Sequence, residues 1–552
     1  MDRREFIERL GLSTAAFAAG YLAPTRSIAG TMPQGGLSRS TPEQQGVSSA
    51  SILRFLEGVS AARIELHSFM LVRHGFVVAE TWWAPYRRNA PHWLYSLSKS
   101  FTSTAVGFAV ADGRLNVSDR VVDFFPGQLP QTVSENLAAL QIKHLLSMSV
   151  GHKADSVATI VGNAAQPDWV RTFLSLPIEH APGEVFLYDT GATFMLSAIV
   201  QKVTGEKVVD YLQPRLFAPL EIGEKSWDES PLGINTGGWG LSVTTETLAK
   251  FGQLYLQKGR WNGKQVLPAT WVEEATSFKI QQPVSWNSGS DPAAQIDHSD
   301  PVAALAKLKQ SSDWYQGYAY QFWRCRHNAF RGDGAFGQFC VVMPDEDAVV
   351  AITSETGNLQ GILDLVWGQL LPGMSSGRAN SLRGPSRELT RTLNTRVLPL
   401  PAGKRSSPMA AKVDGRKFVF ESNSLGVVAA TLTFNGDNCV LALNTAKGSS
   451  KINCGLTRWL DGVSDLPGEP PALLPRKESG PVTVAVAGAW SSDDTFEMQW
   501  RFYATPHRDN LIFEFSGDDV HLQFLNSITA ALGANQSFHP ETRPVLKGTL
   551  TA

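Results

Sequence analysis

Two kinds of hydrophobic pattern divide the chain. Between residues 37 and 372, stretches with strand-like and helix-like periodicity are mixed. Residues 69–80 predict two strands joined by a turn at Gly75, and residues 340–352 predict a second hairpin around the acidic turn at 345–347. Strands near both ends of the segment, with helices between them, predict an α+β domain.

Two apolar segments predict buried helices inside this domain. The first runs from Ser96 to Asp112, has apolar side chains on nearly every face, and is followed by Gly113 as a C-terminal stop. The second runs from Thr193 to Val203 and ends before a glycine. A further helix is predicted over residues 360–371, where it would close the domain.

Beyond residue 408 the hydrophobic period changes to two. Apolar and polar side chains alternate over 498–502 and 511–515, and turn-forming residues recur between such stretches. This pattern predicts a small all-β barrel or sandwich over 409–552. Residues 373–408 are rich in Ser, Gly, Pro and Arg, which is typical of a linker.

Composition narrows the class of protein. The 552 residues carry 49 Lys and Arg against 51 Asp and Glu, a formal charge of −2, so nothing favours nucleic-acid binding by counterion release. With 43% hydrophobic residues, global disorder is excluded. Four cysteines are too few for a disulfide framework, although Cys439 with Cys454 and Cys325 with Cys340 are candidate pairs in an oxidising compartment.

The first 29 residues predict an export signal. Arg3 and Arg4 precede an apolar stretch, Leu10 to Pro24, of about 15 residues, which is shorter than the ~20 residues needed to span a bilayer. Twin arginines before such a stretch are typical of a twin-arginine signal, and residues 27–29 offer a small-residue cleavage site. We therefore expect an exported, periplasmic protein whose mature chain starts near Gly30, without a transmembrane segment.

The strongest candidate chemistry lies at the start of the first buried helix. Ser96 precedes Lys99 by three residues, so both side chains lie on one face of a helix. Burial lowers the pKa of a lysine, and a serine hydroxyl needs a nearby base to become a nucleophile. No other lysine of the chain follows a serine at this spacing.

Two further segments add candidate groups. Tyr188, just before the second helix, is placed to pass a proton to a leaving group. Residues 331–338 contain the G-x-G-x-x-G spacing of dinucleotide-binding proteins, but they run into a strand rather than a helix, so we reject that reading. Glycines here instead let a substrate approach the backbone closely, where N–H groups can form an oxyanion hole. No metal-ligand spacing, Walker loop or Gly-x-Ser-x-Gly elbow occurs, and we expect no metal or cofactor.

In this order, Ser96-x-x-Lys99, Tyr188 and the glycine-rich strand resemble the serine β-lactamase and penicillin-binding-protein superfamily, on its class C side. The resemblance covers residues 37–372 and includes the sequence segments 144–151, 182–188 and 240–264. It implies an antiparallel sheet flanked by helices, with a helical subdomain. The β domain resembles the lipocalin-like modules appended to some members.

The same resemblance implies roles for individual residues. Ser96 would be the acylated nucleophile, Lys99 its base, and Tyr188 an aid to proton transfer. The oxyanion hole would be formed by the backbone N–H groups of Ser96 and Ala335. Substrate would also meet residues of the second and third family boxes, which fall on Thr190, Gly332, Asp333 and Gly334.

Two departures from the family pattern concern the substrate. Thr190 stands where the second box usually has asparagine, and Gly332 stands where the third box has lysine. Losing that lysine should weaken β-lactam binding, because a charge-assisted hydrogen bond contributes roughly 1.5–3 kcal/mol. We therefore expect a lysine at position 332 to improve acylation by β-lactams, with Arg331 a poor substitute because adjacent strand residues face opposite ways.

These observations favour an exported serine hydrolase that cleaves a peptide or other amide bond in a small-molecule or peptide substrate, with no nucleic-acid partner. Resembling families include D-amino-acid peptidases, nylon-oligomer amidases, peptidases of linearised microcystin, and esterases, so an esterase is the first alternative. The second alternative is a penicillin-binding or sensor module that is acylated but does not turn over.

Overall fold

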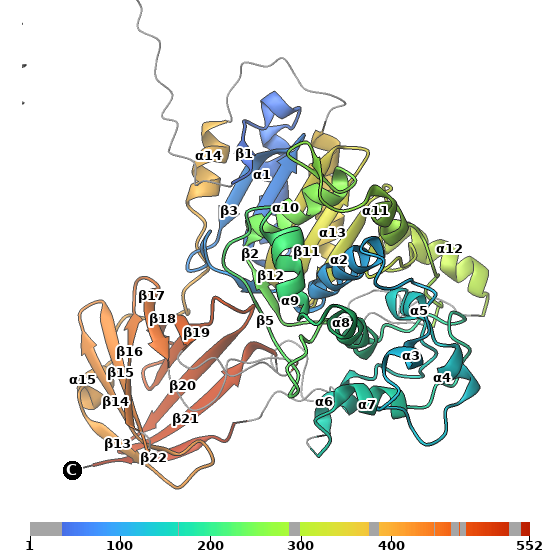
Figure 1. Ribbon diagram of the computed structural model, residues 1–552. Coiled ribbons are helices and arrows are strands. Elements are labelled where there is room, and N and C mark those ends of the chain that lie inside the picture. Colours follow the sequence, from blue (N-terminus) through green and yellow to red (C-terminus); the bar gives the residue numbers. More distant parts are fainter. Residues whose placement is uncertain are drawn as a thin grey trace, which may run out of the picture. The chain divides into compact units, whose positions relative to one another are not determined.

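The structure is a computed structural model that describes residues 36–163, 165–285, 299–374, 386–446, 448–464, 474, 482–528 and 543–551. The predicted signal peptide lies outside these residues. In the part of the chain from Leu37 onward, a seven-stranded sheet flanked by helices is followed by a ten-stranded sheet that closes into a barrel (Figure 1).

The seven-stranded sheet is antiparallel except for its short first strand, which pairs in parallel with β3. The predicted hairpins form its centre, because β2 pairs with both β3 and β12, and β12 pairs with β11. In sheet order the strands are β1 (Ser38–Arg39), β3 (Phe76–Trp82), β2 (Glu65–Arg73), β12 (Ala348–Glu355), β11 (Gln338–Met343), β10 (Phe330–Gly334) and β9 (Trp323–Arg324).

Helices cover this sheet and extend beside it as a helical subdomain, as the sequence predicts (Figure 1). Helix α10 (Thr245–Leu256) packs on β2, β11 and β12. The helices on and around the sheet also include α1 (Ser49–Ala61), α2 (Ser98–Ala111), α11 (Ala269–Thr276), α12 (Pro301–Ser311) and α13 (Leu359–Leu365). Between α2 and α10 the chain forms α3 (Val121–Phe124), α4 (Glu135–Ala139), α5 (Ile142–Leu146), α6 (Val157–Gly162), α7 (Trp169–Ser175), α8 (Thr190–Thr204) and α9 (Val208–Leu212).

The two predicted buried helices form with small shifts of their ends. The first is α2, and the predicted start at Ser96 lies in a preceding single turn, η2 (Tyr95–Leu97). The second is α8, which starts three residues earlier than predicted and ends at Gly205, where φ is +78°. The start moves because the Asp189 side chain accepts a hydrogen bond from the Gly191 N–H and caps the helix.

The C-terminal strands form one continuous antiparallel sheet that closes into a barrel. Closure comes from a bridge between Gly455 of β16 and Ala487 of β18. In chain order the strands are β13 (Lys417–Phe420), β14 (Val427–Asn435), β15 (Asn438–Thr445), β16 (Gly448–Gly455), β17 (Leu460–Ser464), β18 (Val482–Trp490), β19 (Thr495–Arg501), β20 (Arg508–Ser516), β21 (Asp519–Asn526) and β22 (Leu546–Leu550). The turn-forming residues that recur in the sequence, at 435–437, 491–494 and 516–518, each join two successive strands.

The segment predicted as a linker, 373–408, carries structure of its own. Helix α14 (Arg387–Asn394) lies within it and packs on α1 and β3 through the buried Leu389. A composition rich in short polar residues therefore does not exclude a helix. In α14 one buried leucine is enough to fix a short helix on its neighbours.

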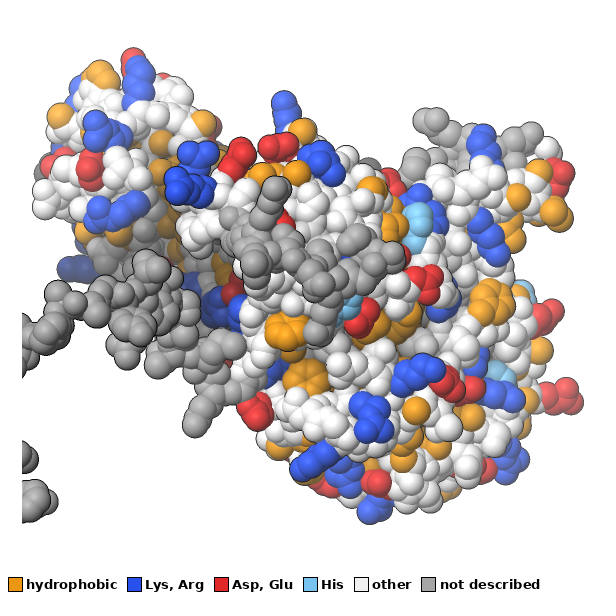
Figure 2. Space-filling view, turned by 90° about the horizontal axis from the view of Figure 1, so that it is seen from above, with side chains coloured by type: hydrophobic (Ala, Val, Ile, Leu, Met, Phe, Trp, Pro, Cys, Tyr) orange, Lys and Arg blue, Asp and Glu red, His pale blue; other side chains and the backbone are white. Residues whose placement is uncertain are grey.

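Two hydrophobic cores hold these parts together. One fills the domain built on the seven-stranded sheet, and the other fills the barrel, from Ala410 to Leu546. The first core also includes Ala485, Tyr503 and Ile528 of the barrel, so apolar side chains of both parts pack together. On the face seen in Figure 2, basic and acidic side chains are interspersed, in keeping with the balanced charge. Within the part of the chain that the structure describes, no helix combines the length and the apolar run needed to cross a membrane.

Candidate active site

Ser96 and Lys99 meet at the start of α2. The Lys99 Nζ atom lies 3.1 Å from Ser96 Oγ, which is hydrogen-bonding distance. Ser96 is partly exposed, whereas the Lys99 side chain is 1% exposed. The arrangement gives an accessible hydroxyl and a base that is shielded from water.

The surroundings of Lys99 favour its neutral form. Burial lowers the pKa of the ammonium group to about 8, although the carboxylates of Asp155, Asp189 and Asp333 act in the opposite direction. The Nζ atom also donates to the carbonyl oxygen of Gly238 at 2.9 Å. Near neutral pH a useful fraction of Lys99 is therefore an amine that can accept the Ser96 proton.

Tyr188 lies beside the nucleophile and its base. Its ring centroid is 4.9 Å from Lys99 Nζ, and the neighbouring Ser96 hydroxyl acts to lower the pKa of the phenol. Trp323 stacks on the ring at 5.5 Å and fixes its plane. Burial and the nearby Asp333 carboxylate raise the pKa of Tyr188, so the phenol stays protonated and is placed to relay or donate a proton.

Thr190 is held by a carboxylate that the sequence analysis did not identify. Asp155 accepts from the Thr190 N–H at 2.8 Å and from its hydroxyl at 2.9 Å. Burial and the neighbouring Asp189 raise the pKa of Asp155 to about 7. Asp155 lies 35 residues upstream of Thr190 and in no motif, so only its place in the fold reveals it.

Gly334 brings the glycine-rich strand against the nucleophile turn. A Cβ atom at this position would lie 2.0 Å from the carbonyl oxygen of Leu94 and 3.2 Å from the backbone nitrogen of Leu97. Only glycine allows this approach, because real Cβ contacts stay beyond 3.0 Å. The next residue, Ala335, is partly exposed, so its N–H is a candidate partner of the Ser96 N–H in an oxyanion hole.

The two other residues of the third box face opposite ways. A Cβ atom at Gly332 would lie 2.7 Å from Ser100 Oγ, inside the packing against α2. Asp333 is on the other face, where its carboxylate accepts from Arg331 Nε at 2.9 Å. Arg331 is fully buried and its guanidinium lies 4.4 Å from the centroid of the Trp314 ring.

This geometry corrects the expectation that a lysine at position 332 would improve β-lactam acylation. Such a side chain would start toward Ser100 and α2 instead of toward Ser96. Arg331 is not a substitute, as expected, because it is already engaged by Asp333 and by the carbonyl oxygen of Asp313. At position 332 the strand has no side chain, and the carboxylate of the next residue, Asp333, is paired with Arg331.

The candidate disulfides are absent, and all four cysteines are free and buried. Cys439 and Cys454 are cross-strand neighbours of β15 and β16, as predicted, but they remain thiols. Cys325 instead accepts a hydrogen bond from Arg331 Nη1 at 3.1 Å, and the Cys340 thiol donates to the Leu248 carbonyl at 3.3 Å. These two thiols thus have separate hydrogen-bond partners.

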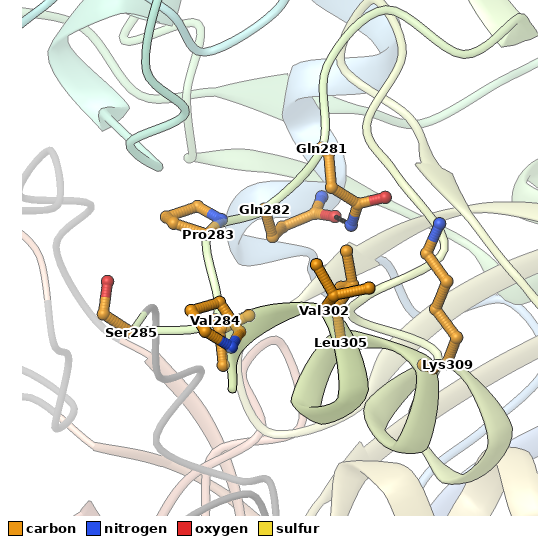
Figure 3. A pocket seen from close by; sticks show the side chains of 10 residues that line it. Gln281, Gln282, Pro283, Val284, Ser285, Val302, Leu305 and Lys309 are labelled. Carbon is orange, nitrogen blue, oxygen red and sulfur yellow. Dashed lines mark hydrogen bonds between the residues drawn. The ribbon is translucent and has the colours of Figure 1, made fainter. Parts of the chain in front are cut away.

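A separate pocket lies between residues 281–285 and α12 (Figure 3). Its wall combines Gln281 and Gln282 with Val302, Leu305 and Lys309 of the helix, and none of the nucleophile residues lines it.

Comparison with known proteins identifies the family. The model of the family described as Beta-lactamase matches residues 54–362, more than half of the chain. The chain therefore belongs to the beta-lactamase family, and the matched residues include the Ser96, Lys99, Tyr188 and Ala335 constellation.

Individual relatives are distant. The 6-aminohexanoate-dimer hydrolase of Paenarthrobacter ureafaciens is 29% identical over 37% of this chain and 56% of its own length. The Beta-lactamase of Escherichia coli K12 is 24% identical over 39% of this chain and 62% of its own. The chain thus spans little more than half the length of these curated relatives. Among solved structures, the octameric penicillin-binding protein homologue from Pyrococcus abyssi is 14% identical, with a TM-score of 0.43, and covers 90% of this chain and 99% of its own.

Proposed function

We propose that this chain is a serine hydrolase that cleaves an amide, peptide or ester bond through an acyl-enzyme on Ser96. The observation that carries the proposal is the 3.1 Å contact between Ser96 Oγ and the buried Lys99 amine. A buried lysine with a lowered pKa beside an accessible serine is the arrangement needed to activate a hydroxyl near neutral pH.

The steps follow from the positions of the groups. The Ser96 hydroxyl gives its proton to Lys99 Nζ as its oxygen bonds to the substrate carbonyl carbon, and the carbonyl becomes an oxyanion. The N–H groups of Ser96 and Ala335 would bind that oxyanion. Tyr188, which stays protonated, passes a proton to the leaving amine or alcohol and recovers one from Lys99. Water then attacks the acyl-enzyme by the same route and releases the acid.

The charge at the third box bears on the substrate class. Asp333 and the packed Gly332 offer no free cation for a substrate carboxylate on this strand. We therefore propose an amide or peptide substrate rather than a β-lactam, with an esterase as the alternative. The name of the Paenarthrobacter relative, 6-aminohexanoate-dimer hydrolase, is in keeping with an amide substrate.

We also propose that the protein is exported to the periplasm, because residues 1–29 carry the twin arginines and the apolar stretch of an export signal. Comparison of the N-terminus of the secreted protein with that of an Arg3→Lys, Arg4→Lys variant tests this. Cytoplasmic retention of the variant and cleavage near Gly30 in the parent protein are the expected results. A parent protein that keeps its N-terminus in the cytoplasm would refute export.

The function is tested by intact-mass measurement after brief exposure to a fluorophosphonate. We expect one adduct on the parent protein, none on Ser96→Ala, and labelling slowed by orders of magnitude in Lys99→Ala. Lys250→Ala is a matched control, because Lys250 is also buried but donates to backbone carbonyls away from Ser96. Labelling of Lys99→Ala at the parent rate would contradict the assignment of the base.

Turnover separates the hydrolase from an acylated but inert sensor. A nitrophenyl ester should give a steady release of nitrophenol that continues for many equivalents per chain. Release that stops after one equivalent would favour the penicillin-binding or sensor alternative.

A further inference from the structure

A segment of the barrel reaches the turn that carries the nucleophile. Between β19 and β20, the carbonyl oxygen of Ala504 accepts a hydrogen bond from the Trp93 N–H at 3.0 Å. The Tyr86 hydroxyl donates to the Thr505 carbonyl at 3.4 Å. Trp93 lies three residues before Ser96, so the barrel contacts the backbone that enters the active site.

His507, in the same segment, is fully buried at this contact. Its Nδ1 atom lies 2.7 Å from Glu355 Oε1, and its Nε2 atom lies 2.5 Å from the Tyr95 hydroxyl. Because a carboxylate only accepts, Nδ1 carries a proton toward Glu355, and Nε2 is left to pair with the Tyr95 hydroxyl. Tyr95 is the residue immediately before Ser96.

The imidazole also contacts the residue beyond the other half of the proposed oxyanion hole. Phe336 follows Ala335, and its ring meets the His507 ring edge-on at 4.6 Å. The Tyr95 and Phe336 rings lie 5.5 Å apart. One side chain of the barrel thus touches both residues that flank the two candidate N–H donors.

Both flanking residues have a backbone that needs support. Tyr95 has φ of +50° and Phe336 has φ of +64°, in the left-handed region that bulky residues rarely adopt. Such conformations persist only where the surrounding contacts hold them. At Tyr95 the conformation determines where the Ser96 N–H points, and at Phe336 it fixes the residue that follows Ala335. The contacts of His507 are in a position to supply that support.

His507 is itself anchored by a charged cluster at the end of the sheet. Glu65 and Glu355 are paired across β2 and β12, so two carboxylates lie side by side. The barrel provides their partners: Arg501 donates to Glu65 at 2.6 Å and 3.1 Å, and Arg508 donates to Glu355. Burial acts to raise the pKa of Glu355, but His507 and Arg508 outweigh it and hold the pKa below its usual value. The carboxylate therefore stays ionised and orients the imidazole.

We propose that His507 is a positioning residue, by which the barrel sets the geometry of the oxyanion hole through Tyr95 and Phe336. This inference rests on the proposed serine-hydrolase function. It assigns the barrel a part in catalysis at Ser96, beyond packing against the catalytic domain.

Two substitutions at His507 separate its two hydrogen bonds. In His507→Gln the side-chain amide reaches about as far as Nε2 and can keep the bond to Tyr95, whereas in His507→Asn it reaches about as far as Nδ1 and keeps only Glu355. Tyr95→Phe removes the same bond from the other side. We expect about a tenfold loss of kcat for nitrophenyl ester hydrolysis in His507→Asn and Tyr95→Phe, with KM within twofold. His507→Gln should retain most of the activity.

Controls distinguish positioning from loss of stability. Tyr86→Phe removes a buried hydroxyl that contacts the same barrel segment without touching Tyr95 or Phe336, and it should keep the parent kcat. All assays are run well below each variant's Tm. The Tyr95→Phe, His507→Asn double variant should be no slower than either single variant, because both remove one shared bond.

Several outcomes would overturn the proposal. Tyr95→Phe with a kcat within twofold of the parent protein would do so, even if the His507 variants do not fold. Equal losses in His507→Gln and His507→Asn, or a double variant whose losses multiply, would show a merely structural role. These failures are distinct from failure of the proposed function, in which the parent protein itself shows no Ser96-dependent labelling, and which would overturn both proposals.

Discussion

Gly334→Ala places one methyl group where the structure has no room for it. The new Cβ would start 2.0 Å from the carbonyl oxygen of Leu94, whereas ordinary contacts begin near 3.4 Å. Since the crowding atom belongs to the backbone, no side chain can rotate away, and β10 must retreat from η2 by about 1.4 Å. That movement carries the neighbouring Ala335 N–H away from Ser96.

The expected loss is about a hundredfold in the rate of acylation, because a displacement of ~1 Å at a reacting centre can cost that much. In free energy this is about 2.7 kcal/mol of transition-state stabilisation. Overpacking should also destabilise the fold by about 1–3 kcal/mol, measured as a lower Tm. The assay is the second-order rate of fluorophosphonate labelling, followed by intact mass below the Tm of the variant.

Gly455→Ala is the matched control for this experiment. Its Cβ would also lie 2.0 Å from a backbone carbonyl oxygen, that of Arg458, but within the barrel at β16. It should lower the Tm and leave the labelling rate unchanged. A folded Gly334→Ala that labels within threefold of the parent protein, or an equal loss in Gly455→Ala, would refute the role assigned to the close approach at Gly334.

Further predictions concern protonation and thiols. The labelling rate should rise with pH through about 8, as Lys99 loses its proton. Asp155→Asn should move that midpoint to lower pH, because the Asp155 charge raises the pKa of Lys99; an unchanged or higher midpoint in a pH-rate profile would contradict this. Dithionitrobenzoate should find no reactive thiol in the folded protein and four per chain after denaturation, because all four cysteines are free and buried. If only two thiols react after denaturation and a reductant exposes the other two, one of the predicted disulfide pairs has formed.

The local pattern of the sequence was enough to predict the central strands of the first domain, its two buried helices and the β character of the barrel. Apolar runs on either side of a turn marked the hairpin of β2 with β3 and that of β11 with β12, and longer apolar stretches marked α2 and α8. Element ends were less accurate where side chains from the fold decide them, as at the Asp189 cap of α8. Within 373–408, composition concealed α14, whose single buried leucine carries no periodic signal.

The sequence by itself determined which serine and lysine meet, since a spacing of three residues at a helix start fixes their neighbourhood before any tertiary contact forms. Only the tertiary structure decided what surrounds them. Asp155 reaches Thr190 across 35 residues, and His507 reaches Tyr95 across 412. The direction of Gly332 and the separate partners of Cys325 and Cys340 were likewise set by packing. The physical reason is the distance along the chain over which each effect acts. The hydrophobic period and the backbone preferences of residues act within a few residues. Burial, the pairing of charges and close backbone contacts depend instead on which elements pack together.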